Sequence, residues 1–516
     1  MMAVLALLLS SAPGAPPPAT RALYAQILDA LEGWDIDRAQ ALIGSLQASD
    51  GEGPVTEELR GRVRFFQGDY AGATALLQGS ESNAAKLATA SLAETSADDQ
   101  RESAHFILRF PRGKDALLAP YALETLERAR ERIGGDLGFL PEGRIRVEIL
   151  RDPAALSRLS PLTESEIETS GTIALCKYNK LMVVSPRALL TGYTWQDTLA
   201  HELTHYLITR KSENKTPIWL HEGIAKFEES RWRGAAGEAL SPATAALLAR
   251  RLQQGTLISF ERMHPSIALL PSQEDAALAF AEVFTFIEFL TKERHASLEA
   301  LLLGLRAGKS DTEAVALAAG EPFDRVTRAW KTYLRSRPMP KELLPLAPER
   351  LKFKEKGVEK RSATEELEAD ELSREIDDRS ARRFAHLGSL LLARSRPVAA
   401  LTELGKAESR VGARSPALSN LYAGVLLGAG REAEAERILR ASLLPYPDIA
   451  QTHLHLAEVE IHAKQWDPAR RELLAANAVD PFDPDIHAGL LKVAQATGDA
   501  TAAALEQTSI ALLAQP

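Results

Sequence analysis

The chain has 516 residues, which is too long for one ordinary domain and favours about three. Hydrophobic residues make up 45% of the sequence and charged residues 25%, the proportions of a soluble globular protein. The net charge of −9 at pH 7 argues against a nucleic-acid-binding protein. The single cysteine, Cys176, excludes an internal disulfide and is more typical of a small buried side chain than of a nucleophile.

An apolar run over residues 1–9 opens the chain, and small residues and prolines follow it. The run is too short to span a bilayer but suits the core of a secretory signal. No Lys or Arg precedes it, and Pro13 and Pro16 crowd the possible cleavage sites, so a mis-assigned start or a loose apolar tail is the alternative. We interpret residues 1–18 as a signal peptide and expect an exported protein, periplasmic or secreted, without a membrane span after processing.

A short internal repeat follows the predicted signal. Residues 68–73 match residues 34–39, which lie 34 positions earlier, and Leu42 recurs as Leu76. This interval predicts paired helices over residues 19–98, and an unrelated pair of helical hairpins is the alternative.

The next segment mixes strands and helices. Strands are predicted at 106–110, 144–150, 172–176 and 181–185, with a helix at about 117–133 between the first two. From Trp195 the pattern is helical almost to Arg335. Strands first and helices afterwards predict an α+β domain over residues 99–337.

A His-Glu-x-x-His pentapeptide at residues 201–205 lies on the first of these later helices. His201 and His205 are i and i+4, so both rings project from one helix face as two ligands of one ion require, with Glu202 one residue round. Zinc in an enzyme needs a third protein ligand and leaves its fourth position to water. Glu222 follows His205 on a second helix, predicted to return antiparallel, where the small Gly223 would allow close packing.

His-Glu-Leu-Thr-His followed by Trp-Leu-x-Glu-Gly-x-Ala resembles the gluzincin metallopeptidases, in particular the peptidase-MA-like group, over roughly residues 103–337. The resemblance implies a thermolysin-like site in which His201, His205 and Glu222 hold zinc and Glu202 activates the zinc-bound water. It also implies that a strand before the motif helix, at residues 181–184, lines up an extended substrate by main-chain hydrogen bonds.

One part of such a site is missing from the sequence. Related proteins often carry a tyrosine that donates to the oxyanion, and Phe280 occupies that place here. Four side chains are possible substitutes: Tyr193, Tyr206, His221 and His264. His221 adjoins Glu222 but points about 100° away on a helix, so we expect it behind the metal ligands or at the surface.

A densely charged stretch separates this domain from the C-terminal third. Residues 338–378 are predicted to be a linker because their charges are mixed in sign. Beyond it, Ala435, Ala469 and Ala503 recur every 34 residues, and prolines keep the same interval. Residues 379–516 therefore resemble the tetratricopeptide family of paired helices. His453 and His455 are expected to be ordinary surface residues of these repeats.

The sequence thus predicts a mostly helical protein, with an α+β zincin-like metallopeptidase domain between two all-α blocks of tetratricopeptide-type repeats. Its predicted function is that of a zinc metallopeptidase with one Zn²⁺, a peptide or protein substrate, and a protein partner bound by the repeats. The alternative is a repeat scaffold with a weak or inactive zincin domain, suggested by Phe280. Spacing alone also leaves open hydrolysis of a non-peptide bond at the same zinc.

Overall fold

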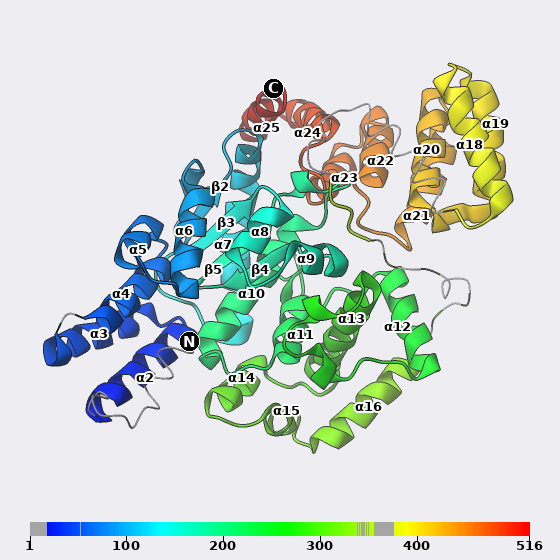
Figure 1. The fold of residues 1–516 in the computed structure, drawn as a ribbon. Coiled ribbons are helices and arrows are strands. Elements are labelled where there is room, and N and C mark those ends of the chain that lie inside the picture. Colours follow the sequence, from blue (N-terminus) through cyan, green and yellow to red (C-terminus); the bar gives the residue numbers. More distant parts are fainter. Residues whose placement is uncertain are drawn as a thin grey trace. The chain divides into compact units, whose positions relative to one another are not determined.

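The structure is a computed structural model that describes residues 18–515 except 52, 338, 340, 342–345, 347, 349 and 355–375 (Figure 1). The predicted signal peptide, apart from its last residue, and most of the predicted linker lie outside the described residues. No helix in the described part is both long and apolar enough to cross a bilayer.

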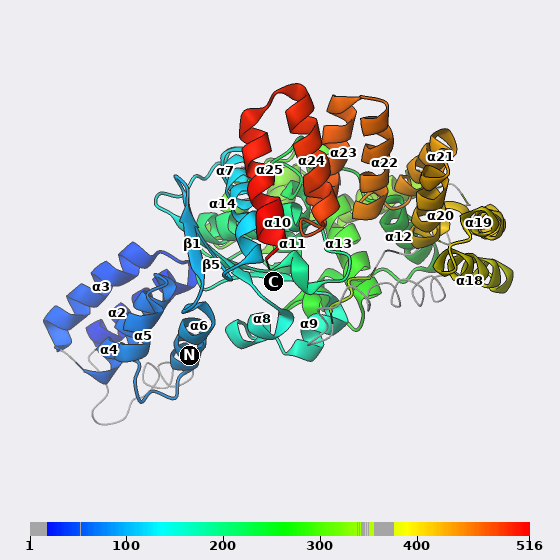
Figure 2. The same cartoon turned by 90° about the horizontal axis from the view of Figure 1, so that it is seen from above.

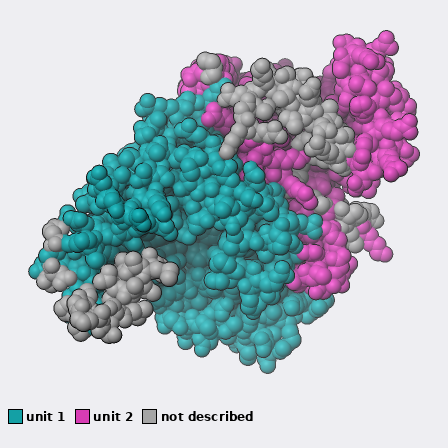
Figure 3. Space-filling view, in the orientation of Figure 1, with its two compact units in different colours: residues 1–185, 197–238, 258–336 teal, residues 186–196, 239–257, 337–516 magenta. Residues whose placement is uncertain are grey.

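The chain divides into two compact units (Figure 3). The first contains residues 1–185, 197–238 and 258–336, and the second contains residues 186–196, 239–257 and 337–516. The second unit therefore includes a short segment, 186–196, that leads into the His-Glu-x-x-His helix. The predicted domains are continuous stretches of sequence, whereas each compact unit joins several separate stretches, so the domain ranges stay predictions.

Five helices begin the first unit and confirm the predicted helix pairs: α2 (Pro18–Glu32), α3 (Ile36–Asp50), α4 (Pro54–Phe66), α5 (Tyr70–Leu76) and α6 (Asn83–Thr95). The repeat has a physical basis in the capping residues. The carboxylates of Asp35 and Asp69 accept hydrogen bonds from the backbone N–H groups of Arg38 and Gly72, so each begins the second helix of a pair.

A five-stranded mixed sheet follows, in the order β1-β2-β3-β5-β4. Its strands are β1 (Asp99–Glu102), β2 (Phe106–Phe110), β3 (Ile145–Leu150), β4 (Ala174–Lys177) and β5 (Lys180–Val184). The three central strands are parallel, and both edge strands run antiparallel to their neighbours. Tyr178 and Asn179 have φ of 57° and 59°, the left-handed pair that a two-residue type I′ hairpin needs between β4 and β5.

The strand order corrects one expectation. Residues 181–184 were predicted to present a free edge to substrate, but β5 is paired with β3 on one side and β4 on the other. The tight hairpin places β4 outside β5, because the other side of β5 is already taken by a parallel partner. The free edge beside the motif helix therefore belongs to β4.

A buried ionic cluster joins the N-terminal helices to the sheet. The Lys180 Nζ atom lies 2.7 Å from Glu148 Oε2 and donates to the Tyr70 hydroxyl at 2.9 Å. The Tyr70 hydroxyl also donates to Glu148. Lys180 and Glu148 are each 1% exposed, so the cluster is closed off from water. The N-terminal helix pairs are thus an integral part of the first unit.

The remaining helices of the central region are α7 (Leu118–Leu137), α8 (Pro153–Leu159), α9 (Glu164–Ser170), α10 (Trp195–Ser212), α11 (Ile218–Glu228), α12 (Pro242–Gln254), α13 (Gln273–Glu288), α14 (Leu298–Arg306), α15 (Asp311–Ala319) and α16 (Phe323–Ser336). Together with the sheet they confirm the α+β prediction. Trp219 stacks on Phe260 with ring centroids 4.2 Å apart, and Phe286 and Trp330 join the same aromatic cluster. Trp219 is therefore a core residue, as expected.

Four antiparallel helix pairs form the C-terminal repeats (Figure 2). They are α18 (Arg379–Ala393), α19 (Pro397–Val411), α20 (Pro416–Gly428), α21 (Glu432–Leu443), α22 (Ala450–His462), α23 (Trp466–Asn477), α24 (Pro484–Thr497) and α25 (Ala500–Leu513). Helices α20, α22 and α24 begin at Pro416, Ala450 and Pro484, which repeats the 34-residue interval. Ala435 and Ala469 are fully buried, which explains why small residues recur there.

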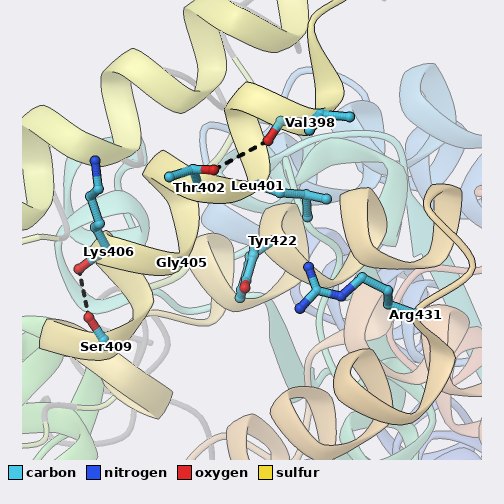
Figure 4. A pocket seen from close by; sticks show the side chains of 8 residues that line it. All are labelled: Val398, Leu401, Thr402, Gly405, Lys406, Ser409, Tyr422 and Arg431. Atoms are coloured by element: carbon cyan, nitrogen blue, oxygen red, sulfur yellow. Dashed lines mark hydrogen bonds between the residues drawn. The ribbon is translucent and has the colours of Figure 1, made fainter.

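A hollow of about 500 Å³ lies along α19, beside α20 (Figure 4). Its lining combines apolar side chains with Tyr422 and two cations, Lys406 and Arg431. Both cations are already paired with nearby carboxylates, Lys406 with Glu403 on α19 and Arg431, just before α21, with Glu434. The hollow is therefore close to neutral.

One expectation for the repeats is wrong. His453 is no ordinary surface residue, because its Nδ1 lies 2.6 Å from Glu472 Oε2 and its Nε2 lies 2.7 Å from the Pro447 carbonyl. One repeat later, His487 makes the same two contacts, to Glu506 and the Pro481 carbonyl, both at 2.7 Å. These histidines tie the first helix of a repeat to its second helix and to the preceding turn.

Candidate metal centre

Helix α10 carries both histidines of the motif. Leu199, Leu203 and Leu207 are fully buried and fix the helix in the core, so the opposite stripe holds the histidine rings. The His201 and His205 ring centroids are 4.7 Å apart. Ligand atoms of these two histidines and of Glu202 all lie within 4.8 Å of one another, as a single metal site requires.

Glu222 on α11 completes a set of three donors. Its Oε2 lies 3.4 Å from His201 Nε2 and 3.3 Å from His205 Nε2, so the three atoms surround one point. Helix α11 packs against α13 (Figure 1). A Cβ at Gly223 would lie 3.0 Å from the Val283 carbonyl oxygen of α13, so the glycine permits that contact, whereas the sequence had suggested a role in packing against α10.

The electrostatics of the three donors favour a cation between them. Burial alone would lower the pKa of His201, but hydrogen bonds to Glu222 and Glu229 raise it to about 10. Burial alone would raise the pKa of Glu222, yet the two imidazoles lower it below its usual range. Each group is thus stabilised in its charged form by a neighbour of opposite charge. A divalent ion between the donors would supply the positive charge next to the carboxylates in place of a proton on His201.

Glu202 lies beside this donor set. It is 5% exposed, and its Oε2 has no hydrogen-bond partner among the described residues. Its carboxylate accepts a hydrogen bond from the Cys176 backbone N–H on β4, while burial raises its pKa. A buried carboxylate oxygen without a partner costs free energy, so it indicates a donor that arrives with a ligand, such as a water held by the metal.

Glu229 and His221 lie behind the three donors. The sequence placed His221 either there or at the surface, and it did not indicate Glu229 as a partner. Glu229 Oε2 lies 3.4 Å from His201 Nδ1, and the two Nδ1 atoms of His205 and His221 are 2.9 Å apart. Burial lowers the pKa of His221 to about 3, so its ring is neutral and accepts the His205 Nδ1–H when His205 Nε2 faces a metal. Glu229 follows Glu222 by seven residues, which is two helical turns, so the sequence already indicated that both carboxylates lie on one face of the helix.

The structure brings Phe280 to the site. Its ring centroid lies 6.1 Å from that of His201 at an interplanar angle of 71°, so an apolar ring stands where a donor was expected. The proposed substitutes are placed differently. Tyr206 packs on Trp34, and its hydroxyl accepts a hydrogen bond from Arg210. The His221 ring faces His205. Tyr193 belongs to the second unit, and His264 follows a 3₁₀ turn.

Cys176 shares the neighbourhood without the properties of a nucleophile. Burial and the nearby Glu202 carboxylate raise the pKa of its thiol well above the usual range. A thiol that stays protonated is a poor nucleophile and a poor metal ligand. The donor set is therefore two imidazoles and one carboxylate, which suits zinc with an open fourth position.

Residues 138–336 match the family model of the Peptidase MA superfamily, and this segment holds His201, Glu202, His205 and Glu222. The predicted resemblance is thereby confirmed for that segment. The comparison with curated proteins gave no match.

Similar solved structures include leukotriene A4 hydrolase from yeast, at 14% identity and a TM-score of 0.27 over 80% of this chain and 66% of that chain. This chain thus spans just under two thirds of the length of that hydrolase. The Cut9–Hcn1 hetero-tetramer of the APC/C matches at 15% identity and a TM-score of 0.27, over 99% and 82% of the two chains.

Proposed function

We propose that this chain, which carries a Peptidase MA superfamily domain at residues 138–336, is a zinc-dependent metallopeptidase. One observation carries the proposal. The Oε2 atom of Glu222 lies within 3.4 Å of the Nε2 atoms of both His201 and His205, while the buried Glu202 beside them has an oxygen that no described residue satisfies. Three ligands and a separate base are what hydrolysis at zinc needs.

When bound, zinc supplies a Lewis acid that polarises the scissile carbonyl and lowers the pKa of a water. In our proposal Glu202 takes the proton from that water as the water oxygen attacks the carbonyl carbon. Glu202 then gives the proton to the nitrogen as the C–N bond breaks, so a carboxylic acid and an amine leave. Burial raises the pKa of Glu202, which helps it to hold the proton between the two steps.

We propose that the substrate pairs with β4. Val184 N–H donates to the Ile173 carbonyl, so alternate residues Ala174 and Cys176 turn their backbone groups away from β5. The Cys176 N–H is used by Glu202, which leaves the other groups of this edge for a peptide. An extended peptide added here would lie next to the base.

The test is the Glu202→Gln variant assayed on a broad peptide library, with zinc measured by elemental analysis. We expect hydrolysis to fall by about 10²–10⁴-fold while zinc stays bound. Glu222→Ala should lose the zinc equivalent itself. Glu124→Gln, an exposed carboxylate paired with Arg128 on α7, is the matched control and should change neither quantity. Activity retained in Glu202→Gln would contradict the mechanism.

Phe280 favours a second candidate function. A zincin domain without an oxyanion donor could serve as a binding module, with the repeats as its scaffold. Cleavage of library peptides that a zinc chelator abolishes would exclude this function. Zinc binding without any cleavage would support it.

We further propose that the C-terminal repeats bind a protein partner and that the protein is exported. Stacked helix pairs present a long surface of the kind that repeat proteins use for partners. The mass of the mature protein tests export, since removal of a signal at residues 1–18 would shorten the chain by that segment.

A further inference from the structure

We propose that Trp195 is a positioning residue, which fixes the first turn of the metal-bearing helix α10 to the turn between α23 and α24 of the C-terminal repeats. The inference rests on the proposed function only in taking α10 as the metal-bearing helix. All the contacts that carry it lie within the second compact unit, to which residues 186–196 belong.

Trp195 is held on its side chain and on its backbone. The residue is 1% exposed, and the indole Nε1–H donates to the Asn477 carbonyl at 3.0 Å. Its backbone N–H lies 3.2 Å from the Ala478 carbonyl, and the Tyr193 N–H donates to the Val479 carbonyl at 3.0 Å. Three consecutive backbone carbonyls at the end of α23 thus accept hydrogen bonds from Tyr193 and Trp195, at the start of α10.

Gly192 lets the two backbones approach. Its φ is +68°, and a Cβ there would lie only 2.1 Å from the Val479 carbonyl oxygen. A side chain would therefore be strained by conformation and would also collide with a backbone atom that cannot move aside. Arg187 adds a contact from the same segment, with its guanidinium 6.0 Å from the centre of the Phe482 ring.

The segment before Trp195 is held on a second side. Leu190 N–H donates to the Lys352 carbonyl, and Lys354 N–H donates to the Ala188 carbonyl, both at 2.9 Å. These bonds flank an antiparallel bridge between Leu189 and Phe353. Residues 188–195 are therefore fixed by two stretches of chain that come more than 150 positions later.

The consequence follows from the stiffness of a helix. His201 comes six residues after Trp195, about 9 Å along the axis, so a shift or loosening of the first turn reaches the ligand with little loss. Within the first unit, Asp197 accepts from the Trp232 Nε1–H at 2.7 Å, which gives α10 a second attachment two residues further on. Whatever disturbs the α23–α24 turn should thus alter metal binding, and metal binding should in return protect that turn.

The test compares Trp195→Phe, which keeps an aromatic ring but loses the indole N–H, with Trp466→Phe in α23 as a control. Trp466 packs against the core of the same repeats and lies at the opposite end of α23 from Asn477. We expect Trp195→Phe to bind zinc about tenfold more weakly in competition with a chromophoric chelator. We also expect faster amide hydrogen exchange in residues 195–201 and 477–482. Trp466→Phe should leave zinc affinity unchanged.

Zinc affinity equal to wild type in Trp195→Phe overturns the inference. If the wild-type protein binds no zinc, the proposed function fails instead, and exchange alone decides the inference. Faster exchange in residues 195–201 then supports the anchor, and unchanged exchange contradicts it. Phe482→Ala provides an independent disturbance from the repeat side, and it should raise exchange in the same helix turn.

Discussion

Phe280 presents an apolar ring to His201 at a position where a hydroxyl would be useful. Phe280→Tyr adds that hydroxyl to a side chain already placed beside the ligands. Because one oxyanion donor is typically worth about 10²-fold in turnover, we expect kcat to rise by about that factor in peptide hydrolysis assays. Phe384→Tyr on α18 controls for the added hydroxyl elsewhere. Equal rates for both variants and wild type would show that another residue already donates.

Glu229 holds the outer nitrogen of His201, and its charge should strengthen metal binding. Glu229→Gln keeps the shape but removes the charge, so we expect zinc affinity to fall about 10-fold to 100-fold in chelator competition. Glu228→Gln is the matched control on the same helix. Burial raises the pKa of Glu228 to about 8, so this carboxyl is already neutral at pH 7. Equal losses in the two variants would contradict a specific effect of Glu229.

Of the individual site residues, the sequence could predict those whose spacing places them on one face of a helix. His201, Glu202 and His205 follow from one pentapeptide, and the structure brings Glu222 to them as the return helix suggested. The Cys176 N–H could not be predicted, since its approach to Glu202 depends on which strand forms the sheet edge. The roles of these residues remain proposals.

The paired contacts of His453 make the C-terminal repeats sensitive to pH. Both ring nitrogens face acceptors, the Glu472 carboxylate and the Pro447 carbonyl, so both bonds form only when the ring carries two protons. Burial lowers the pKa of His453, but Glu472, Pro447 and the nearby Asp448 raise it overall. The stabilisation is therefore complete below the unfolded pKa of about 6.5 and is lost as pH rises through the folded pKa.

We expect the thermal midpoint of the repeats to fall between pH 6 and pH 9, as followed by circular dichroism. His453→Gln should flatten that dependence, because a glutamine does not titrate. His462→Gln is a suitable control, since the His462 side chain is largely exposed and pairs with Glu432 on α21. An identical pH profile for His453→Gln and wild type would contradict the assignment.

Elements built from local patterns were predictable, and their pairing was not. The β4–β5 hairpin follows from two short apolar runs around residues 177–180, and the helix predicted at 117–133 is α7. The order of the sheet depends on parallel contacts between strands far apart in sequence, which no local pattern encodes. This is why residues 181–184 were taken for the free edge.

For the molecule as a whole, the buried Lys180–Glu148 pair of β5 and β3 matters because Tyr70 of α5 binds both of its members and so joins the N-terminal helices to the sheet. Lys180→Met leaves a buried carboxylate without its counter-charge, so we expect the free energy of unfolding to fall by about 3–5 kcal/mol in denaturant titration. Lys86→Met, at an exposed position on α6, is the control and should change it little. A small effect at Lys180 would mean that water reaches Glu148.

The association of segments far apart in the chain was the hardest feature to predict from the sequence. The 34-residue interval indicated repeats at both ends, and the composition indicated several domains. Nothing in the sequence indicated that residues 186–196 belong with the C-terminal repeats, because the Trp195 and Gly192 contacts are made to backbone carbonyls. Every residue type has a backbone carbonyl, so an acceptor of this kind leaves no pattern in the sequence.

The cluster of Tyr70, Glu148 and Lys180 also bears on how such a chain can change over generations. A deletion of the N-terminal helices would bare opposite charges and weaken the sheet in a single event, so selection would act against it at once. We therefore expect the helices and the sheet to be kept or lost together. A chain without these helices is therefore expected to carry apolar side chains in place of the charged pair.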